Sequence, residues 1–209
     1  MLCAQDCATG YCPSSLIVHH KAGQVSPETV DITYTVIQSS ITGTAACWIA
    51  QNLGAPTYTT TLTDNAATTT TGWYWQFGQQ KGLRAVSHVI VNTSDIVSDF
   101  TAQTTDWATA NDPCNLLLGG AWRIPTRTEW NAILSAWSYN LSNNGLHLIQ
   151  GGHYGGSTFY DSPYCGYWTN TRSGTNTAYT YQVSYTASAA SVPSIGMSWA
   201  STLRCIRAL

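Results

Sequence analysis

The stretch DPCNLLLGGAWRIPTRTEWNAILSAW, residues 112–137, contains the strongest helix signal in the chain. Thr126 is suited to cap a helix, and Glu129, three residues later, can bond back to the Thr126 backbone N–H in a capping box. Large apolar residues then follow at positions i, i+3, i+4 and i+7: Trp130, Ile133, Leu134 and Trp137. Because this spacing places them on one stripe, the sequence predicts a helix over 126–137 with one buried face.

Alternating and β-branched runs on both sides of this helix predict strands. Before it they cover 30–37, 47–50 and the aromatic segment 73–77; after it, 146–149, 166–171, 179–186 and 201–206. A long surface loop is predicted at 56–71, and a flexible glycine-rich loop at 151–156. Within 179–186 we expect the face with Tyr179, Tyr181, Val183 and Tyr185 to point inward, and the face with Ala178, Thr180, Gln182 and Ser184 to point outward.

Five ordered motifs carry a resemblance to a known family. Cys114 and the pattern Gly-x-Trp-Arg-Ile-Pro-Thr-x-x-Glu-Trp at 120–130 form the most specific one, and the others lie at 41–54, 72–78, 166–171 and 203–207. Together they resemble the Fibrobacter succinogenes major paralogous domain family. The resemblance implies an α+β protein of the C-type lectin-like fold, with a small twisted antiparallel sheet, one or two helices and long loops. We expect this domain to cover 31–209, preceded at 1–30 by a stem or the end of another module.

The number of cysteines indicates an oxidising compartment, and their spacing is not that of a zinc site. They are seven: Cys3, Cys7, Cys12, Cys47, Cys114, Cys165 and Cys205. The resemblance implies a bridge between Cys114 and Cys205. We expect Cys47 and Cys165 to form an additional bridge. The pairing of the N-terminal three stays open: one is free, bonds another chain, or bonds a segment before Met1.

Composition narrows the classes of partner. Charged residues make up only 9% of the chain, against about 25% in an average soluble protein. The net charge of -2 leaves no electrostatic footprint for nucleic acid. No apolar run reaches the length of about 18 residues that suggests a membrane span. We expect an extracellular, cell-surface or virion protein, and we expect the sequence to be the C-terminal part of a longer one.

Catalytic and metal-binding motifs are weak in this sequence. No two of the five histidines have the i, i+4 spacing of a helical zinc motif, and the glycines at 151–156 lack the lysine of a phosphate-binding loop. Paired carboxylates for glycoside hydrolysis would have to come from Asp106, Asp112, Glu129 and Asp161, of which Glu129 has a capping task. We therefore expect no cofactor and no enzyme. Calcium held by loop oxygens of Asp99, Asp106, Asp112 and Asp161 stays open as an alternative.

Binding by surface is the function that the C-terminal region favours. Tyr, Ser, Gly, Asn and Trp, which are enriched at 154–199, give contact area and adaptable hydrogen bonds at little entropic cost. The C-type lectin-like fold presents its ligand face in this region. The resemblance therefore implies these contact residues: Asn170, Arg172, Asn176, Tyr179, Tyr185, Ser198 and Trp199.

Three functions follow in order of preference. The first is a recognition or adhesion module for a protein or glycan, on a cell surface or phage. The second is a structural subunit of an extracellular filament or virion, whose low-charge surface would pack against copies of itself. The third is an enzyme resembling the formylglycine-generating type, which would require a reactive thiol at Cys165 or Cys205.

Overall fold

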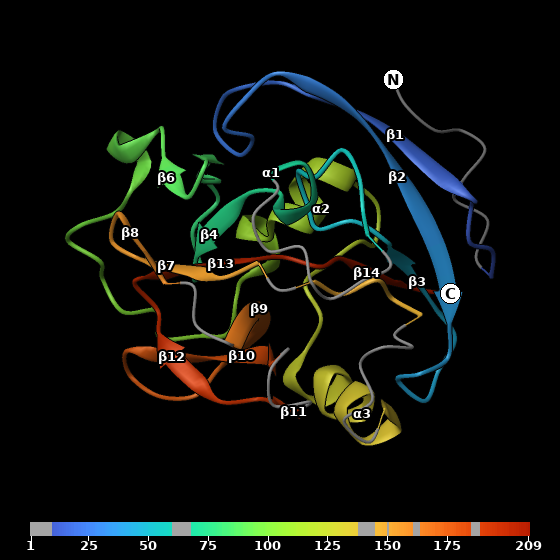
Figure 1. Ribbon diagram of the computed structural model, residues 1–209. Coiled ribbons are helices and arrows are strands. Elements are labelled where there is room, and N and C mark those ends of the chain that lie inside the picture. Colours follow the sequence, from blue (N-terminus) through green and yellow to red (C-terminus); the bar gives the residue numbers. More distant parts are fainter. Residues whose placement is uncertain (1–9, 60–67, 138–144, 150, 161–163, 185–188) are drawn as a thin grey trace.

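The computed structural model describes residues 10–59, 68–137, 145–149, 151–160, 164–184 and 189–209. Antiparallel strands make up most of the regular structure and helices are few, which is consistent with the expected α+β class (Figure 1). Instead of the one small sheet that was expected, the described residues form three sheets, of four, eight and two strands. The strands are β1 (Ser15–His20), β2 (Val30–Ser39), β3 (Ala46–Ile49), β4 (Tyr74–Gln76), β5 (Ala85–Val86), β6 (Val89–Ile90), β7 (His153–Gly155), β8 (Thr158–Tyr160), β9 (Tyr164–Arg172), β10 (Thr177–Ser184), β11 (Ala189–Ser191), β12 (Ser194–Gly196), β13 (Trp199–Thr202) and β14 (Ile206–Ala208). The helices are α1 (Thr68–Thr71), α2 (Pro113–Leu118), α3 (Arg127–Trp137) and the short 3-10 turns η1 (Thr93–Asp95) and η2 (Thr109–Asn111).

The first sheet joins both ends of the described chain in the order β1-β2-β3-β14. On β2, Ile32, Tyr34 and Val36 are buried while Asp31 and Thr33 are exposed, so the alternation in the sequence predicted this strand correctly. The predicted stem at 1–30 contributes β1, which pairs with β2 along its whole length. In Figure 1 these two long strands form one side of the molecule.

The second sheet has the order β11-β10-β9-β13-β7-β8, with β12 paired to β10 and β4 paired to β13. The predicted strands at 166–171 and 179–186 correspond to β9 and β10, but the expected orientation is wrong at the start of β10. The side chains of Tyr181, Gln182, Val183, Ser184 and Tyr185 lie outside the described ones. Ala178 and Thr180 are fully buried, whereas Tyr179 is half-exposed. The reason is Trp168, which lies opposite Thr180, is itself fully buried, and donates its indole N–H to the carbonyl of Trp75 at 2.6 Å. Small residues beside this large ring fill the interior.

Two segments that follow α3 differ from their predicted structure. Residues 146–149 form no strand, because side chains satisfy their backbone groups: Arg204 donates to the carbonyl of His147 at 3.0 Å, and the Tyr167 hydroxyl bonds both backbone groups of Ile149. The loop predicted at 151–156 instead contains β7, which pairs with β8 through a two-residue turn. Gly156 occupies the positive φ, 62°, that such a hairpin turn requires.

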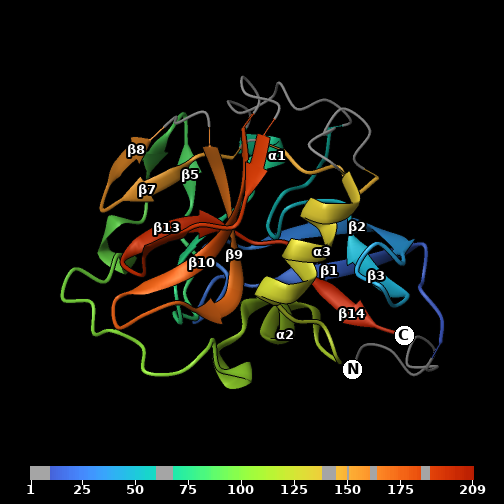
Figure 2. The same cartoon turned by 90° about the horizontal axis from the view of Figure 1, so that it is seen from below.

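Helix α3 has the predicted capping box. Thr126 Oγ1 accepts from the Glu129 N–H at 3.2 Å, and the Thr126 N–H donates to Glu129 Oε2 at 2.8 Å. Trp130 then stacks on Tyr167 of β9 and contacts the edge of Trp48 of β3, with ring centroids 5.5 and 5.8 Å apart. The helix therefore packs against both sheets at once (Figure 2).

A second helix, α2, was not predicted. Asp112 caps it, because the carboxylate accepts from the Cys114 N–H at 2.8 Å, and Pro113 occupies the first turn, where its missing N–H costs nothing. The other Asp112 oxygen accepts from the Ile124 N–H at 2.9 Å. Asp112 therefore connects α2 to the chain that leads into α3. The dipeptide Asp-Pro was the sequence signal for this helix.

Two disulfides cross-link the described residues. Cys114 bonds Cys205, as the resemblance implied. Cys47 bonds Cys12, so the expected bridge between Cys47 and Cys165 is wrong. The reason is sheet membership, since Cys47 lies on β3 of the first sheet and Cys165 on β9 of the second. Cys3 and Cys7 lie outside the described residues.

No helix in the described part of the chain combines the length and the apolar character that a bilayer span needs.

Candidate ligand-binding site

The predicted contact residues fall into two groups. Asn170, Arg172 and Tyr179 lie near the start of α3, where the Asn170 N–H donates to the carbonyl of Pro125 at 2.9 Å. The others lie at the turns beside β12, where the Met197 N–H donates to the carbonyl of Asn176 at 2.9 Å and Ser198 and Trp199 follow directly. Tyr185 lies outside the described residues.

The first group holds a loop in place. The Asn170 carbonyl accepts from the Trp107 N–H at 2.7 Å, and the Asn170 side chain accepts from the Thr171 hydroxyl at 2.9 Å. The Arg172 backbone N–H donates to Asp106 at 3.0 Å, and the Arg172 guanidinium donates to the carbonyl of Thr104. These contacts give Asn170 and Arg172 a structural task.

Tyr179 is covered by a cation. The Arg127 guanidinium lies 3.9 Å from the centroid of the Tyr179 ring, within the range of a cation–π interaction. Tyr179 is half-exposed and Arg127 exposed, so a ligand can reach this pair from solvent.

Trp199 of the second group belongs to an aromatic cluster, which we call the aromatic site: Trp199, Tyr160 and His153. The Trp199 ring lies 5.0 Å from Tyr160 and 4.8 Å from His153, centroid to centroid. His153 and Tyr160 are cross-strand partners on β7 and β8, and Trp199 on β13 pairs with Gly155. Tyr160 is 42% exposed, Trp199 is half-buried and His153 is 7% exposed. The two outer rings therefore present apolar surface above a buried histidine.

Glycines make room for the Trp199 ring. A Cβ at Gly196 would lie 3.1 Å from Trp199, and one at Gly155 would lie 3.6 Å from Trp199 and 3.0 Å from Tyr160. Rings thus lie directly over the backbone of neighbouring strands. This arrangement fixes their orientation and reduces the entropy lost when a ligand packs on them.

A buried amide fixes the backbone beside the aromatic site. Gln76 of β4 donates to the carbonyls of Ser198 and Val97, at 2.8 and 3.1 Å, and accepts from the Val97 N–H at 2.8 Å. Gln76 is 3% exposed. It therefore joins the loop around residue 97 to the turn that carries Trp199.

The aromatic site carries no formal charge. Burial lowers the pKa of His153 below its ordinary value, so its imidazole is neutral at pH 7. Ser198, beside Trp199, is exposed and supplies a neutral hydroxyl. The site thus combines aromatic faces with neutral hydrogen-bonding groups.

The resemblance implied Trp199 and Ser198 as contact residues, whereas Tyr160 and His153 were not among the residues expected at this surface. Because residues 151–156 were expected to form a flexible loop, strand β7, which carries His153 and pairs with β8, was not predicted. The signal that could have found them is the glycine turn between two aromatic triplets, His153-Tyr154-Gly155 and Thr158-Phe159-Tyr160.

His20 is the most buried histidine of the described chain. The Tyr34 hydroxyl accepts from the Gly54 N–H at 2.9 Å and lies 2.9 Å from Nε2 of His20. Its own hydrogen is available for Nε2 of a neutral imidazole. Burial, with a smaller contribution from neighbouring His19, lowers the pKa of His20 to about 4. His20 therefore stays neutral in the folded protein across the mildly acidic range.

This neutral His20 predicts a loss of stability in acid. Between pH 6.5 and about 4 the unfolded chain protonates residue 20 and the fold does not, so the free energy of unfolding decreases as pH falls, by about 3 kcal/mol in all. The test is urea unfolding of the parent and of His20→Gln, which keeps an acceptor for Tyr34. Plotted against pH, the two free energies of unfolding should converge from pH 7 to pH 4. Burial raises the pKa of Asp112 to about 6, and this shift has the opposite effect on how stability depends on pH. The effect is the same in the parent and in His20→Gln, so it cancels when their free energies of unfolding are subtracted. Parallel curves would contradict the prediction.

The carboxylates considered for catalysis have structural partners. Asp112 caps α2, and Glu129 completes the capping box while receiving two hydrogen bonds from Arg123, at 2.6 and 2.8 Å. Asp106 accepts from the Arg172 backbone, and Asp161 lies outside the described residues. In the part of the chain that the structure describes, no three His, Cys, Asp or Glu side chains gather into a metal-binding group.

No protein-family model matches this chain, and the searches found no similar curated protein and no similar solved structure. The family resemblance of the five motifs therefore stays a prediction.

Proposed function

We propose that this chain is a non-enzymatic recognition module that binds a protein or a glycan through its C-terminal surface. The observation that carries the proposal is the aromatic site, where Trp199 and Tyr160 are held in fixed orientations and remain partly exposed. Tryptophan and tyrosine dominate binding energy at interfaces because they offer large rigid contact areas. The proposal includes an extracellular, cell-surface or virion location, which the two disulfides favour.

The proposal includes the C-type lectin-like fold for residues 31–209. Two features support it: α3 follows the Trp-Arg-Ile-Pro-Thr motif with its capping box, and Cys114 bonds Cys205 as the family resemblance implies. Fold alone does not decide the ligand, because one fold serves many functions. The aromatic site is therefore the part of the proposal to test first.

Replacing Trp199 by alanine should weaken ligand binding about 30-fold, the size typical of an aromatic hot spot. Ligands would first be identified with the parent protein on arrays of glycans and of cell-surface proteins, and affinities then measured by calorimetry. Tyr11→Ala is the matched control, because Tyr11 is 63% exposed and lies near Cys12 rather than near β13. Equal losses in both variants, or none in Trp199→Ala, would remove the aromatic site from the proposal.

A specific feature favours the second function, a self-assembling structural subunit. Strand β1 lies at the edge of the first sheet, and its Ile17 is 70% exposed. The strand sequence Ser-Leu-Ile-Val-His-His contains no lysine or proline, the residues that usually protect such edges. A second chain could therefore extend the sheet along β1.

Light scattering on a sizing column, without reductant and over a concentration series, separates the two functions. A recognition module should remain a monomer of 22.6 kDa at every concentration. A structural subunit should grow into oligomers, and Ile17→Lys should return it to the monomer because a charge at the edge opposes strand pairing. Growth that Ile17→Lys leaves unchanged would exclude β1 as the contact.

A further inference from the structure

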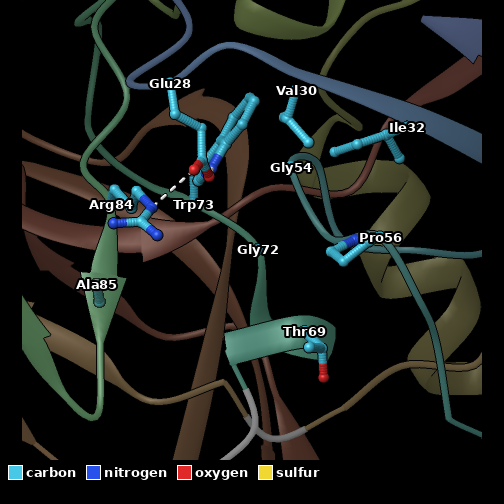
Figure 3. A pocket seen from close by; sticks show the side chains of 10 residues that line it. All are labelled: Glu28, Val30, Ile32, Gly54, Pro56, Thr69, Gly72, Trp73, Arg84 and Ala85. Atoms are coloured by element: carbon cyan, nitrogen blue, oxygen red, sulfur yellow. Dashed lines mark hydrogen bonds and ion pairs between the residues drawn. The ribbon is translucent and has the colours of Figure 1, made fainter.

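A cavity of about 200 Å³ lies away from the aromatic site, between the start of β2, the turn after β3, the chain entering β4, and β5 (Figure 3). Val30, Ile32 and Pro56 supply apolar walls on one side, and Ala85 lies on the other. Glu28 and Arg84 supply its charged groups, and their side chains are 34% and 40% exposed, so the cavity opens to solvent.

The wall formed by Trp73 is closely packed. Gly54 has φ 85° and passes so close to the Trp73 ring that a Cβ at Gly54 would overlap it. The Trp73 ring also contacts the edge of His20, with centroids 5.0 Å apart, and donates its indole N–H to Glu28 Oε1 at 2.9 Å. A ligand would thus meet a cavity that is already formed, which lowers the entropy cost of binding.

The charged groups of the cavity offer more hydrogen-bond donors than acceptors. Glu28 uses both oxygens, because Oε1 accepts from Trp73 and Oε2 accepts from Nε of Arg84 at 2.8 Å. A guanidinium has five N–H donors, and this contact uses the single one on Nε. The described residues provide no acceptor for the terminal nitrogens of Arg84.

The position of Arg84 is fixed by its backbone. Its N–H donates to the Asn92 side chain at 2.7 Å, and its carbonyl accepts from the Val91 N–H at 2.9 Å. Its terminal nitrogens point away from Glu28 in Figure 3. What the cavity lacks is therefore an acceptor on the ligand, and a carboxylate is the acceptor that a guanidinium binds best, through two parallel hydrogen bonds.

We propose that this cavity binds a small carboxylate with an apolar body. The carboxylate would bond the terminal nitrogens of Arg84, and the body would lie against Val30, Ile32 and Pro56. A water molecule takes about 30 Å³ in the liquid, so a volume of about 200 Å³ holds about seven heavy atoms of similar size. Pentanoate has this size and is the probe of choice. The site shares no residue with the aromatic site, so its test does not depend on the proposed function.

Nuclear magnetic resonance of the tryptophan indole groups tests the proposal on the whole chain. The chain has nine tryptophans, and Trp73→Phe assigns the Trp73 signal. Pentanoate should shift that signal saturably, with a dissociation constant on the order of millimolar. Pentanol and pentylamine, which have the apolar body without the carboxylate, should bind at least about tenfold more weakly.

Two variants remove the site by different routes. Arg84→Gln removes the charge and should weaken pentanoate binding at least about tenfold, whereas Ala85→Leu keeps Arg84 and should block binding by filling the cavity. Arg207→Gln, distant in sequence and bonded to the Tyr11 carbonyl, is the matched control and should bind as the parent does. Unchanged signals of the other tryptophans establish that each variant is folded.

Three results would overturn the proposal. The first is the absence of a saturable shift with pentanoate, and the second is equal binding of pentanol or pentylamine. The third is unchanged affinity in both Arg84→Gln and Ala85→Leu. If Arg84→Gln disturbs the fold, Ala85→Leu decides alone, because its substitution leaves the contact between Glu28 and Arg84 in place.

Discussion

Replacing Arg204 by methionine should lower the free energy of unfolding by about 3–5 kcal/mol. Arg204 is completely buried, and its guanidinium donates to the carbonyls of Ile49 and His147, each at 3.0 Å, and of Ala50. Methionine fills much of the volume and removes every donor, so two buried carbonyl oxygens and a partly buried one lose this partner. Since domains of this kind are stable by about 5–15 kcal/mol, this single change should remove a large part of the total.

Urea unfolding without reductant measures the effect of Arg204→Met. Arg204→Lys should recover only a minor part of the loss, because one ammonium group cannot reach acceptors that a planar guanidinium spans. Arg207→Met is the matched control: Arg207 is half-exposed, and its loss should cost about 1 kcal/mol or less. A loss below about 1 kcal/mol for Arg204→Met would show that water replaces the guanidinium.

Removing the bridge between Cys114 and Cys205 should cost about 4–5 kcal/mol, and removing the bridge between Cys12 and Cys47 roughly 1 kcal/mol less. The sequence separations are 91 and 35, and a longer closed loop restricts the unfolded chain more strongly. Both sulfur atoms of the first bridge also lie in the core, since Cys114 and Cys205 are completely buried, whereas Cys12 is only partly buried.

Paired alanine variants of each bridge make this comparison. Cys114→Ala with Cys205→Ala, and Cys12→Ala with Cys47→Ala, would be unfolded in urea after the remaining thiols are alkylated. The expected order of stability is parent, then the variant lacking the bridge at Cys12, then the variant lacking the bridge at Cys114. The reverse order of the two variants would contradict the loop-length argument.

Arg204 also shows how the protein joins segments that are distant in sequence. The three carbonyls that it binds belong to the end of β3 and to the segment after α3, and the neighbouring Cys205 bonds α2. The motif Leu203-Arg204-Cys205-Ile206-Arg207, noted in the sequence for its resemblance, thus lies where the sheets and helices meet. Its role in the fold follows from contacts that no local pattern could reveal.

Local signals in the sequence determined the elements that depend on neighbouring residues. The capping box of Thr126 and Glu129 marked the start of α3, and alternation marked β2, because caps and periodicity act within a few residues. Family resemblance implied the bridge from Cys114 to Cys205. The resemblance also implied Trp199 and Ser198 as contact residues, and that role stays a prediction.

Tertiary structure decided everything that depends on which distant segments meet. Cys47 bonds Cys12 because β1, β2 and β3 share a sheet, and β10 turns Ala178 and Thr180 inward because the Trp168 ring occupies the interior. Likewise, the aromatic site requires three strands side by side, and the cavity at Arg84 requires segments from the first half of the chain to converge. Such pairings are set by side-chain volume and sheet order across the whole molecule, which the periodicity of a single segment does not encode.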